Sequence, residues 1–146
     1  MKKLFFFSAL LFLAFHACRN NQSSAENASI VSQRDTANFT RIQWSDTLID
    51  FGTIKMGDSV QVKFQCTNIG TKPLFLTGVR ASCGCTIPSY TESAILPGEN
   101  GIVTASFNSN KSHPGDIYKT VYVTSNTPGG DNYVLTFTGK IVQPVQ

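Results

Sequence analysis

Two cysteines that flank a glycine, Cys83-Gly84-Cys85, carry the most distinctive chemistry in this sequence of 146 residues. In an extended strand their side chains would share one face about 6.5–7 Å apart, which is too far for a bond. Gly84 would allow the backbone to leave the strand and bring the two sulfurs together. Three interpretations follow: a strained and easily reduced disulfide, a corner whose thiols stay reduced or pair with another protein, and a soft-metal site.

A metal site would need further ligands, and the candidates are Met56 and His113. In a β-sandwich, the loops that carry these residues and the two cysteines would meet at one end. Thiolate, thioether and imidazole groups suit Cu(I), or Zn without the methionine. No cysteine pair recurs and no His-x-x-x-His spacing exists, so the pattern is weaker than that of a zinc finger. The simpler interpretations are a loop histidine before a Pro-Gly turn and a methionine that covers the end of the sandwich.

The sequence predicts no other chemistry. His113 is the only histidine after the N-terminal segment, and no serine motif accompanies it to form a nucleophile–base set. There is no glycine-rich phosphate loop before a helix. The net charge of +3 comes from 12 basic and 9 acidic residues, without the dense basic patch of a nucleic-acid binder. We therefore expect no enzyme, no nucleic-acid partner and, apart from the alternative of Cu or Zn, no cofactor.

The N-terminus has the features of a secretory signal peptide over residues 1–17. Lys2 and Lys3 precede an uncharged, mostly apolar run that is shorter than the roughly 20 residues of a membrane span. The run ends in Phe15-His16-Ala17-Cys18, which resembles the bacterial lipobox. We expect cleavage before Cys18 and lipidation of that cysteine. The alternative is an ordinary signal peptide that leaves Cys18 as a free thiol.

Residues 18–40 are expected to be the lipidated cysteine and a flexible tether, because Asn, Ser, Gln and Ala dominate and few apolar residues occur. Acidic residues just after the lipidated cysteine mark surface export in some Gram-negative lineages, and residues 19–25 contain none. We therefore expect a cell-envelope protein anchored in the membrane, at the outer membrane and facing the periplasm, where disulfides are admissible. Asp35-Thr36-Ala37 resembles a short O-glycosylation motif, which makes Thr36 a glycosylation candidate.

From about residue 42 onward, apolar and polar residues alternate with the period of two that β-strands with one buried face require. Turn signals such as Met56-Gly57-Asp58 and Pro114-Gly115-Asp116 separate these runs, and no stretch keeps helical periodicity. We predict an all-β, Ig-like antiparallel β-sandwich of about seven strands over residues 41–146. The expected strands are 47–55, 59–68, 74–82, 93–96, 101–108, 117–125 and 133–142.

Cys66 is expected to be a buried and inert thiol. It lies on the apolar face of its strand, near the turn that leads to the next strand, whereas Cys83 lies at the far end of that next strand. At about 3.3 Å per residue the two cysteines would be on the order of 25 Å apart. A disulfide requires Cα atoms within roughly 7 Å, so Cys66 should not pair with either cysteine of the motif.

The order of short motifs along the chain resembles a bacterial Ig-like family, domain of unknown function 1573, over roughly residues 48–142. This family is similar in style to the sandwich domains of major sperm protein and of the ASPM/SPD-2/Hydin group. The resemblance implies an Ig-like fold, and it implies no activity because the family has none assigned. The matching segments are Asp50-Phe51-Gly52-Thr53-Ile54, Asn68-Ile69-Gly70, Leu74-Phe75-Leu76, Ser82-Cys83-Gly84-Cys85-Thr86, Pro97-Gly98-Glu99 and Lys119-Thr120-Val121-Tyr122-Val123.

Two functions are consistent with the sequence. The first is a membrane-tethered, non-catalytic module that binds another envelope protein or a glycan, through loops 68–73, 97–101 and 126–132 or through an unpaired strand edge. The asparagine, glycine and proline content of these loops suits an adaptable surface. The second is a redox-active or metal-handling protein that uses Cys83 and Cys85. Trp44 is expected to pack on the edge of the sandwich rather than to stack on a sugar.

Overall fold

The computed structural model describes residues 36–129 and 133–143, and Thr36–Gln146 form one compact unit. Cys18 and the expected signal peptide lie outside the described residues. No helix in the described part is both long and apolar enough for a membrane crossing. The elements are η1 (Thr36–Asn38), β1 (Ile42–Trp44), β2 (Leu48–Lys55), β3 (Ser59–Asn68), β4 (Leu76–Ala81), β5 (Thr86–Tyr90), β6 (Asn100–Asn108), η2 (Ser109–Lys111), β7 (Gly115–Ser125) and β8 (Tyr133–Val142).

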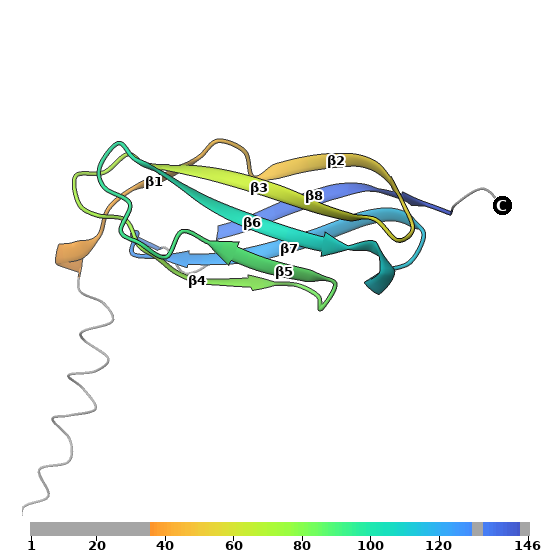
Figure 1. The fold of residues 1–146 in the computed structure, drawn as a ribbon. Helices are drawn as coiled ribbons and strands as arrows, with labels where there is room; N and C mark the ends of the chain where they lie inside the picture. Colours follow the sequence, from red (N-terminus) through yellow and green to blue (C-terminus); the bar gives the residue numbers. More distant parts are fainter. Residues whose placement is uncertain (1–35, 130–132, 144–146) are drawn as a thin grey trace, which may run out of the picture. The chain divides into compact units, whose positions relative to one another are not determined.

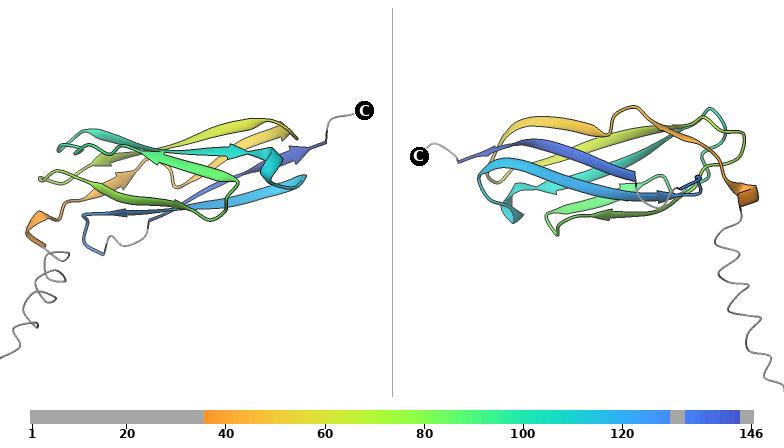
Figure 2. Two further views of the ribbon diagram at one scale, coloured as in Figure 1. Left: turned by 60° about the horizontal axis from the view of Figure 1, so that its bottom comes forward. Right: turned by 180° about the vertical axis from the view of Figure 1, so that it is seen from behind.

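Two four-stranded sheets pack face to face, with the strand orders β1-β3-β6-β5 and β2-β8-β7-β4 (Figures 1 and 2). The predicted all-β sandwich is confirmed. Among the strand pairs of the described residues, only β2–β8 is parallel, with Leu48 beside Thr136 and Ile54 beside Ile141. The chain reaches this arrangement because β1 pairs with β3 in one sheet, after which residues 45–47 carry it across to the edge of the other sheet.

The core lies between the sheets, where the apolar side chains of the alternating strands point inward. Phe107 of the first sheet and Phe137 of the second are fully buried and meet edge to face, with ring centroids 5.8 Å apart. Phe51 stacks on Phe107 at the same distance, 5.8 Å. A fully buried phenylalanine contributes about 1.5–3 kcal/mol, so this cluster contributes substantially to holding the two sheets together.

The strand predicted at residues 93–96 is wrong. The strand of this region is β5, which begins directly after the Cys-Gly-Cys motif and pairs antiparallel with β6, Pro88 lying opposite Ala105. Pro88 obscures this strand in the sequence, but it is tolerated because β5 is an edge strand. Within residues 93–96 the only ladder contact in the structure is a single bridge between Leu74 and Ile95.

Residues 42–44 form the short strand β1, which is not among the expected strands because the first of those begins at residue 47. Trp44 packs against the core from this edge strand, as expected, and its ring centroid is 6.1 Å from that of Tyr133.

The compact unit begins earlier than residue 41. Thr40 is only 4% exposed, and its hydroxyl donates to Asn68 Oδ1 at 2.9 Å. The end of the expected tether is therefore packed onto the domain, and Thr36 lies in η1.

Candidate functional site

The Cys-Gly-Cys motif forms the connection from β4 in one sheet to β5 in the other. A disulfide joins Cys83 and Cys85, whose Cα atoms are 5.3 Å apart. Backbone hydrogen bonds hold both sides of this corner: Ser82 N donates to Thr120 O at 2.9 Å, and Asn108 N donates to Cys85 O at 3.0 Å. Of the three interpretations of the motif, the structure has the disulfide.

Gly84 is not required by the backbone of this corner. Five glycines of the described residues have a positive φ, and Gly84 is not among them. A Cβ atom added at Gly84 would meet nothing within 4 Å. The expectation that the two cysteines meet through the conformational freedom of glycine is therefore wrong, because an ordinary turn brings them together. The missing side chain instead leaves open space beside the disulfide.

The two sulfurs of the disulfide lie in different environments. Cys85 is 6% exposed and belongs to the core cluster, whereas Cys83 is only half-buried. The hydroxyl of Thr86 lies close to both of them, with Oγ1 at 3.8 Å from Cys83 Sγ and 3.9 Å from Cys85 Sγ. Thr86 is itself 5% exposed. The corner thus combines a partly exposed cysteine that packs against the core, a buried cysteine and a buried threonine.

Met56 and His113 lie in loops at the same end of the domain as this corner (Figure 1). The turn after β2 is bonded to η2, since Gly57 N donates to Ser109 Oγ at 2.9 Å. Met56 packs against the core and His113 is exposed. In residues 36–129 and 133–143 no three His, Cys, Asp or Glu side chains are grouped as a metal would require. Because the two sulfurs are also bonded to each other, this donor set does not fit Cu or Zn.

Cys66 is a free thiol with no exposed surface, as predicted. Its Sγ donates to Gly101 O at 3.6 Å, and burial raises the pKa of the thiol. Cys66 pairs with Gly101 at the start of β6, whereas Thr86 pairs with Phe107 near its end. Six residues of strand correspond to about 20 Å, so Cys66 is remote from the disulfide corner.

The loops at the opposite end of the sandwich use their asparagines internally. Asn68 is fully buried, and its amide donates to Lys72 O and to Ile95 O, both at 2.8 Å. Asn126 accepts from Phe75 N at 2.7 Å. The Asn68 and Asn126 amides thus tie neighbouring loops together, and binding through these loops stays a prediction from the sequence.

A surface that the sequence reasoning missed covers the outer side of the second sheet. We call it the Tyr118 face, and it consists of Leu48, Arg80, Tyr118, Tyr122 and Val134. Cross-strand pairing places Tyr122 between Arg80 and Val134, and the Arg80 guanidinium carbon lies 4.6 Å from the centroid of the Tyr122 ring. On the same outer side of the sheet, Leu48 lies opposite Thr136 and Tyr118 lies opposite Thr138. Tyr118 is 69% exposed, Leu48 61% and Val134 47%.

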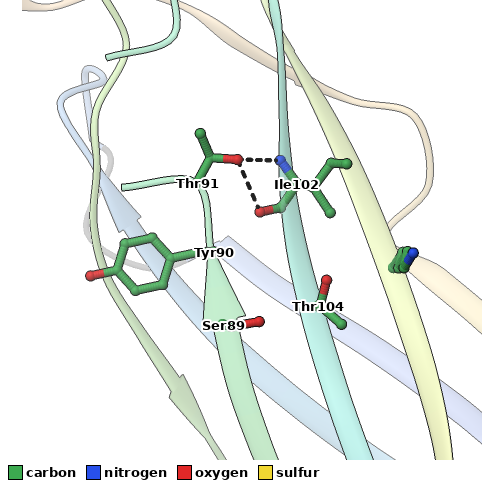
Figure 3. Close-up of a pocket in the computed structure, with 6 residues that line it drawn as sticks. Ser89, Tyr90, Thr91, Ile102 and Thr104 are labelled. Atoms are coloured by element: carbon green, nitrogen blue, oxygen red, sulfur yellow. Dashed lines mark hydrogen bonds between the residues drawn. The ribbon is translucent and has the colours of Figure 1, made fainter. Parts of the chain in front are cut away.

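Two shallow depressions lie on the outer faces of the sheets. One, of about 480 Å³, borders the Tyr118 face and is lined by residues that include Asp50, Asp116, Tyr118 and Lys140. The other, of about 290 Å³, lies over β5 and β6 (Figure 3). There the Thr91 hydroxyl accepts from Ile102 N at 3.0 Å, while the Tyr90 ring points away from β6.

The fold is that of an Ig-like β-sandwich domain. Residues 42–141 match the family described as "Protein of unknown function (DUF1573)", and the chain belongs to this family. No curated protein matches the chain.

Several solved structures share the fold at low sequence identity. A protein of unknown function from Porphyromonas gingivalis W83 superposes with a TM-score of 0.61 at 16% identity, over 72% of this chain and 48% of that one. This chain therefore spans about half the length of that relative. The ASH/PapD-like domain 7 of human CEP192 superposes with a TM-score of 0.56 at 15% identity, over 74% of this chain and 89% of that one. A family 123 glycoside hydrolase from Clostridium perfringens superposes with a TM-score of 0.58 at 8% identity, over 74% of this chain and 28% of that one.

Proposed function

We propose that this protein is a non-catalytic Ig-like module, tethered through a lipid on Cys18 to a membrane of the cell envelope, that binds another envelope protein through the Tyr118 face. The observation that carries this proposal is the large exposure of apolar and aromatic side chains on the outer side of one sheet. Tyr118 and Leu48 are 69% and 61% exposed. Contiguous exposed apolar surface on a soluble domain marks an interaction site.

The composition of the face favours a protein over a glycan as the ligand. Tyrosine and arginine are enriched in the energetically dominant parts of protein interfaces. Arg80 lies over the Tyr122 ring, so both side chains are already held together before a partner binds. The aliphatic side chains of Leu48 and Val134 add apolar contact area that a hydroxyl-rich sugar would not use. A protein surface with an apolar centre and acidic groups near Arg80 is the complementary partner.

The anchor rests on the sequence of the N-terminus. Lys2 and Lys3, the uncharged run and Ala17-Cys18 together form a lipoprotein signal. Residues 19–35 would then join the lipid to the domain, which begins at Thr36. By a random-coil estimate, 17 such residues reach on the order of 20–25 Å, which is enough to hold the domain clear of a bilayer surface.

Affinity capture from envelope extract tests the binding surface. The purified full chain is compared with the double variant Leu48→Ser/Tyr118→Ser and with a control, Ile87→Ser, which removes an equally exposed side chain (67%) from the other sheet. We expect one envelope protein to be captured by the wild type and the control, and its yield to fall at least about tenfold with the double variant. Equal capture by all three chains contradicts the proposal. Loss of the captured material after glycosidase treatment would identify a glycan instead.

The mass of the protein isolated from membranes tests the anchor. We expect a chain that begins at Cys18 and carries a lipid, and a Cys18→Ser variant that is absent from the membrane fraction. An unmodified Cys18 on the mature protein would contradict lipid tethering and leave the test of the Tyr118 face unaffected.

A further inference from the structure

We propose that the Cys83–Cys85 disulfide is a site of thiol–disulfide exchange with proteins that carry two neighbouring thiols, in which Cys83 Sγ is the sulfur attacked and Cys85 Sγ is the leaving group. This inference does not rest on the proposed binding function, because it concerns the connection from β4 to β5 and uses none of the residues of the Tyr118 face.

The direction of attack follows from the burial of the two sulfurs. A thiolate approaches a disulfide along the line of the S–S bond, from the side opposite the departing sulfur. Cys83 is half-buried and Cys85 is 6% exposed. Cys83 is therefore the more exposed target for an external thiolate, whereas Cys85 is buried in the core cluster and is the more protected of the two. Gly84, between the two cysteines, is exposed, and a Cβ atom there would meet nothing within 4 Å outside its chain neighbours.

Thr86 supplies the group that stabilises the departing sulfur. Its Oγ1 lies 3.9 Å from Cys85 Sγ and 3.8 Å from Cys83 Sγ. The residue is 5% exposed and is held by pairing with Phe107 and by a backbone bond from its N to Cys83 O at 3.4 Å. When the S–S bond breaks, the hydroxyl can rotate and donate to the Cys85 thiolate, which would otherwise form without a donor in a covered position. Hydrogen bonds to charged groups are the strong ones, so this contact should accelerate the step.

The chemistry balances in two exchanges. The first thiolate of the substrate forms a bond to Cys83 Sγ while the Cys83–Cys85 bond breaks, and the electron pair leaves on Cys85, which then takes a proton from water. The second substrate thiolate attacks the substrate sulfur of this mixed disulfide and releases Cys83 as a thiolate, which is protonated in turn. The substrate dithiol has become a disulfide, and two electrons have reduced Cys83 and Cys85 to thiols.

Cys66 takes no part in this exchange. It is fully buried and lies about 20 Å along β6 from the corner. Its presence therefore does not complicate an experiment that measures the reactivity of Cys83 and Cys85.

Two variants of the full chain, each also carrying Cys18→Ser so that Cys66 is the only other cysteine, test which sulfur is attacked. Cys85→Ser leaves the Cys83 thiol and Cys83→Ser leaves the Cys85 thiol, and each is converted to its mixed disulfide with thionitrobenzoate. Glutathione is then added, and the release of the coloured thiol is followed. We expect release from Cys83 to be at least about tenfold faster than release from Cys85. Equal rates, or faster release from Cys85, would overturn the proposed direction.

The role of Thr86 is tested on the intact disulfide with dithiothreitol as the dithiol. We expect Thr86→Val to slow reduction about tenfold, Thr86→Ser to restore the wild-type rate, and the control Thr104→Val to leave the rate unchanged. Thermal unfolding of each variant verifies that it folds. Reduction of Thr86→Val at the wild-type rate would overturn the role of Thr86. A wild-type disulfide that dithiothreitol cannot reduce in the folded protein would overturn the exchange site as a whole.

Discussion

The ring of Phe51 on β2 lies against Gly139 on β8, where an added Cβ atom would come within 2.3 Å of Cε2. Phe51 cannot easily retreat, because its other side stacks on Phe107 with ring centroids 5.8 Å apart. The parallel pairing of β2 with β8 therefore requires a residue without a side chain at position 139. This close approach connects β2, the edge strand of the second sheet, to the aromatic core.

We predict that Gly139→Ala lowers the free energy of unfolding by about 1–3 kcal/mol, because overpacking must displace Phe51 from its neighbours. Urea unfolding measures the change. Gly84→Ala is the matched control, since a Cβ there meets nothing within 4 Å, and its effect should stay within about 0.5 kcal/mol. Equal effects of the two substitutions would show that the Phe51–Gly139 contact is not tight.

Asn68→Ala should destabilise the domain by about 2–4 kcal/mol. The substitution removes the donor to Lys72 O and one of the two donors to Ile95 O, which also accepts from Leu74 N. It also removes the acceptor of the Thr40 hydroxyl and of Gly70 N. Each buried polar group left unsatisfied costs about 1–3 kcal/mol. The exposed Asn110 provides the control, and Asn110→Ala should change stability by less than about 0.5 kcal/mol. Comparable losses in urea unfolding for both variants would contradict the role given to the Asn68 amide.

The buried Cys66 thiol predicts a loss of stability in alkaline solution. Burial raises its pKa in the folded state above the value in the unfolded chain. Its contribution is therefore fully present below the unfolded pKa, roughly 8.5, and is lost as the pH rises from there through the raised folded value. Above about pH 8.5 the stability of the wild type should fall more steeply with pH than that of Cys66→Val, by up to about 1.4 kcal/mol per pH unit. Parallel pH profiles of the two proteins would mean that Cys66 ionises as readily in the folded state as in the unfolded chain, which would contradict this prediction.

Removal of the disulfide should cost little stability. The Cys83–Cys85 bridge joins residues only two apart in sequence. The chain-entropy relation gives about 1.5 kcal/mol for so short a loop. We expect the double variant Cys83→Ser/Cys85→Ser to fold, with a drop of this size in its unfolding free energy. A failure to fold would make the bridge a structural necessity, which its short loop does not predict.

The sequence predicted the core strands because their periodicity is local. Val62, Phe64 and Cys66 point inward on β3, as the alternation requires. The parallel partner of β2 was not predictable, since a period of two is the same for parallel and antiparallel neighbours. Pro88 made β5 difficult to recognise in the sequence. The strand expected at residues 93–96 contains only the isolated bridge at Ile95.

The candidate sites were predictable to different degrees. The spacing of Cys83 and Cys85 allowed a disulfide among other states, but it could not tell which sulfur is covered, because burial depends on distant strands. The burial of Asn68 depends on carbonyl groups of two other loops, so composition alone suggested an exposed role. In the sequence, the Tyr118 face is indicated only by Tyr118 and Tyr122, which occupy the outward positions of an alternating strand. The Thr36 and Cys18 modifications remain predictions from the sequence.

Site-specific photo-crosslinking in intact cells tests the central claim most directly. A benzoylphenylalanine replaces Tyr118 in one full-length chain and Ile87 in another, two positions of similar exposure, 69% and 67%, on opposite sheets. The account predicts a discrete crosslinked envelope protein from position 118 and none from position 87. The absence of a crosslink at 118, or the same product from both positions, would contradict binding through the Tyr118 face.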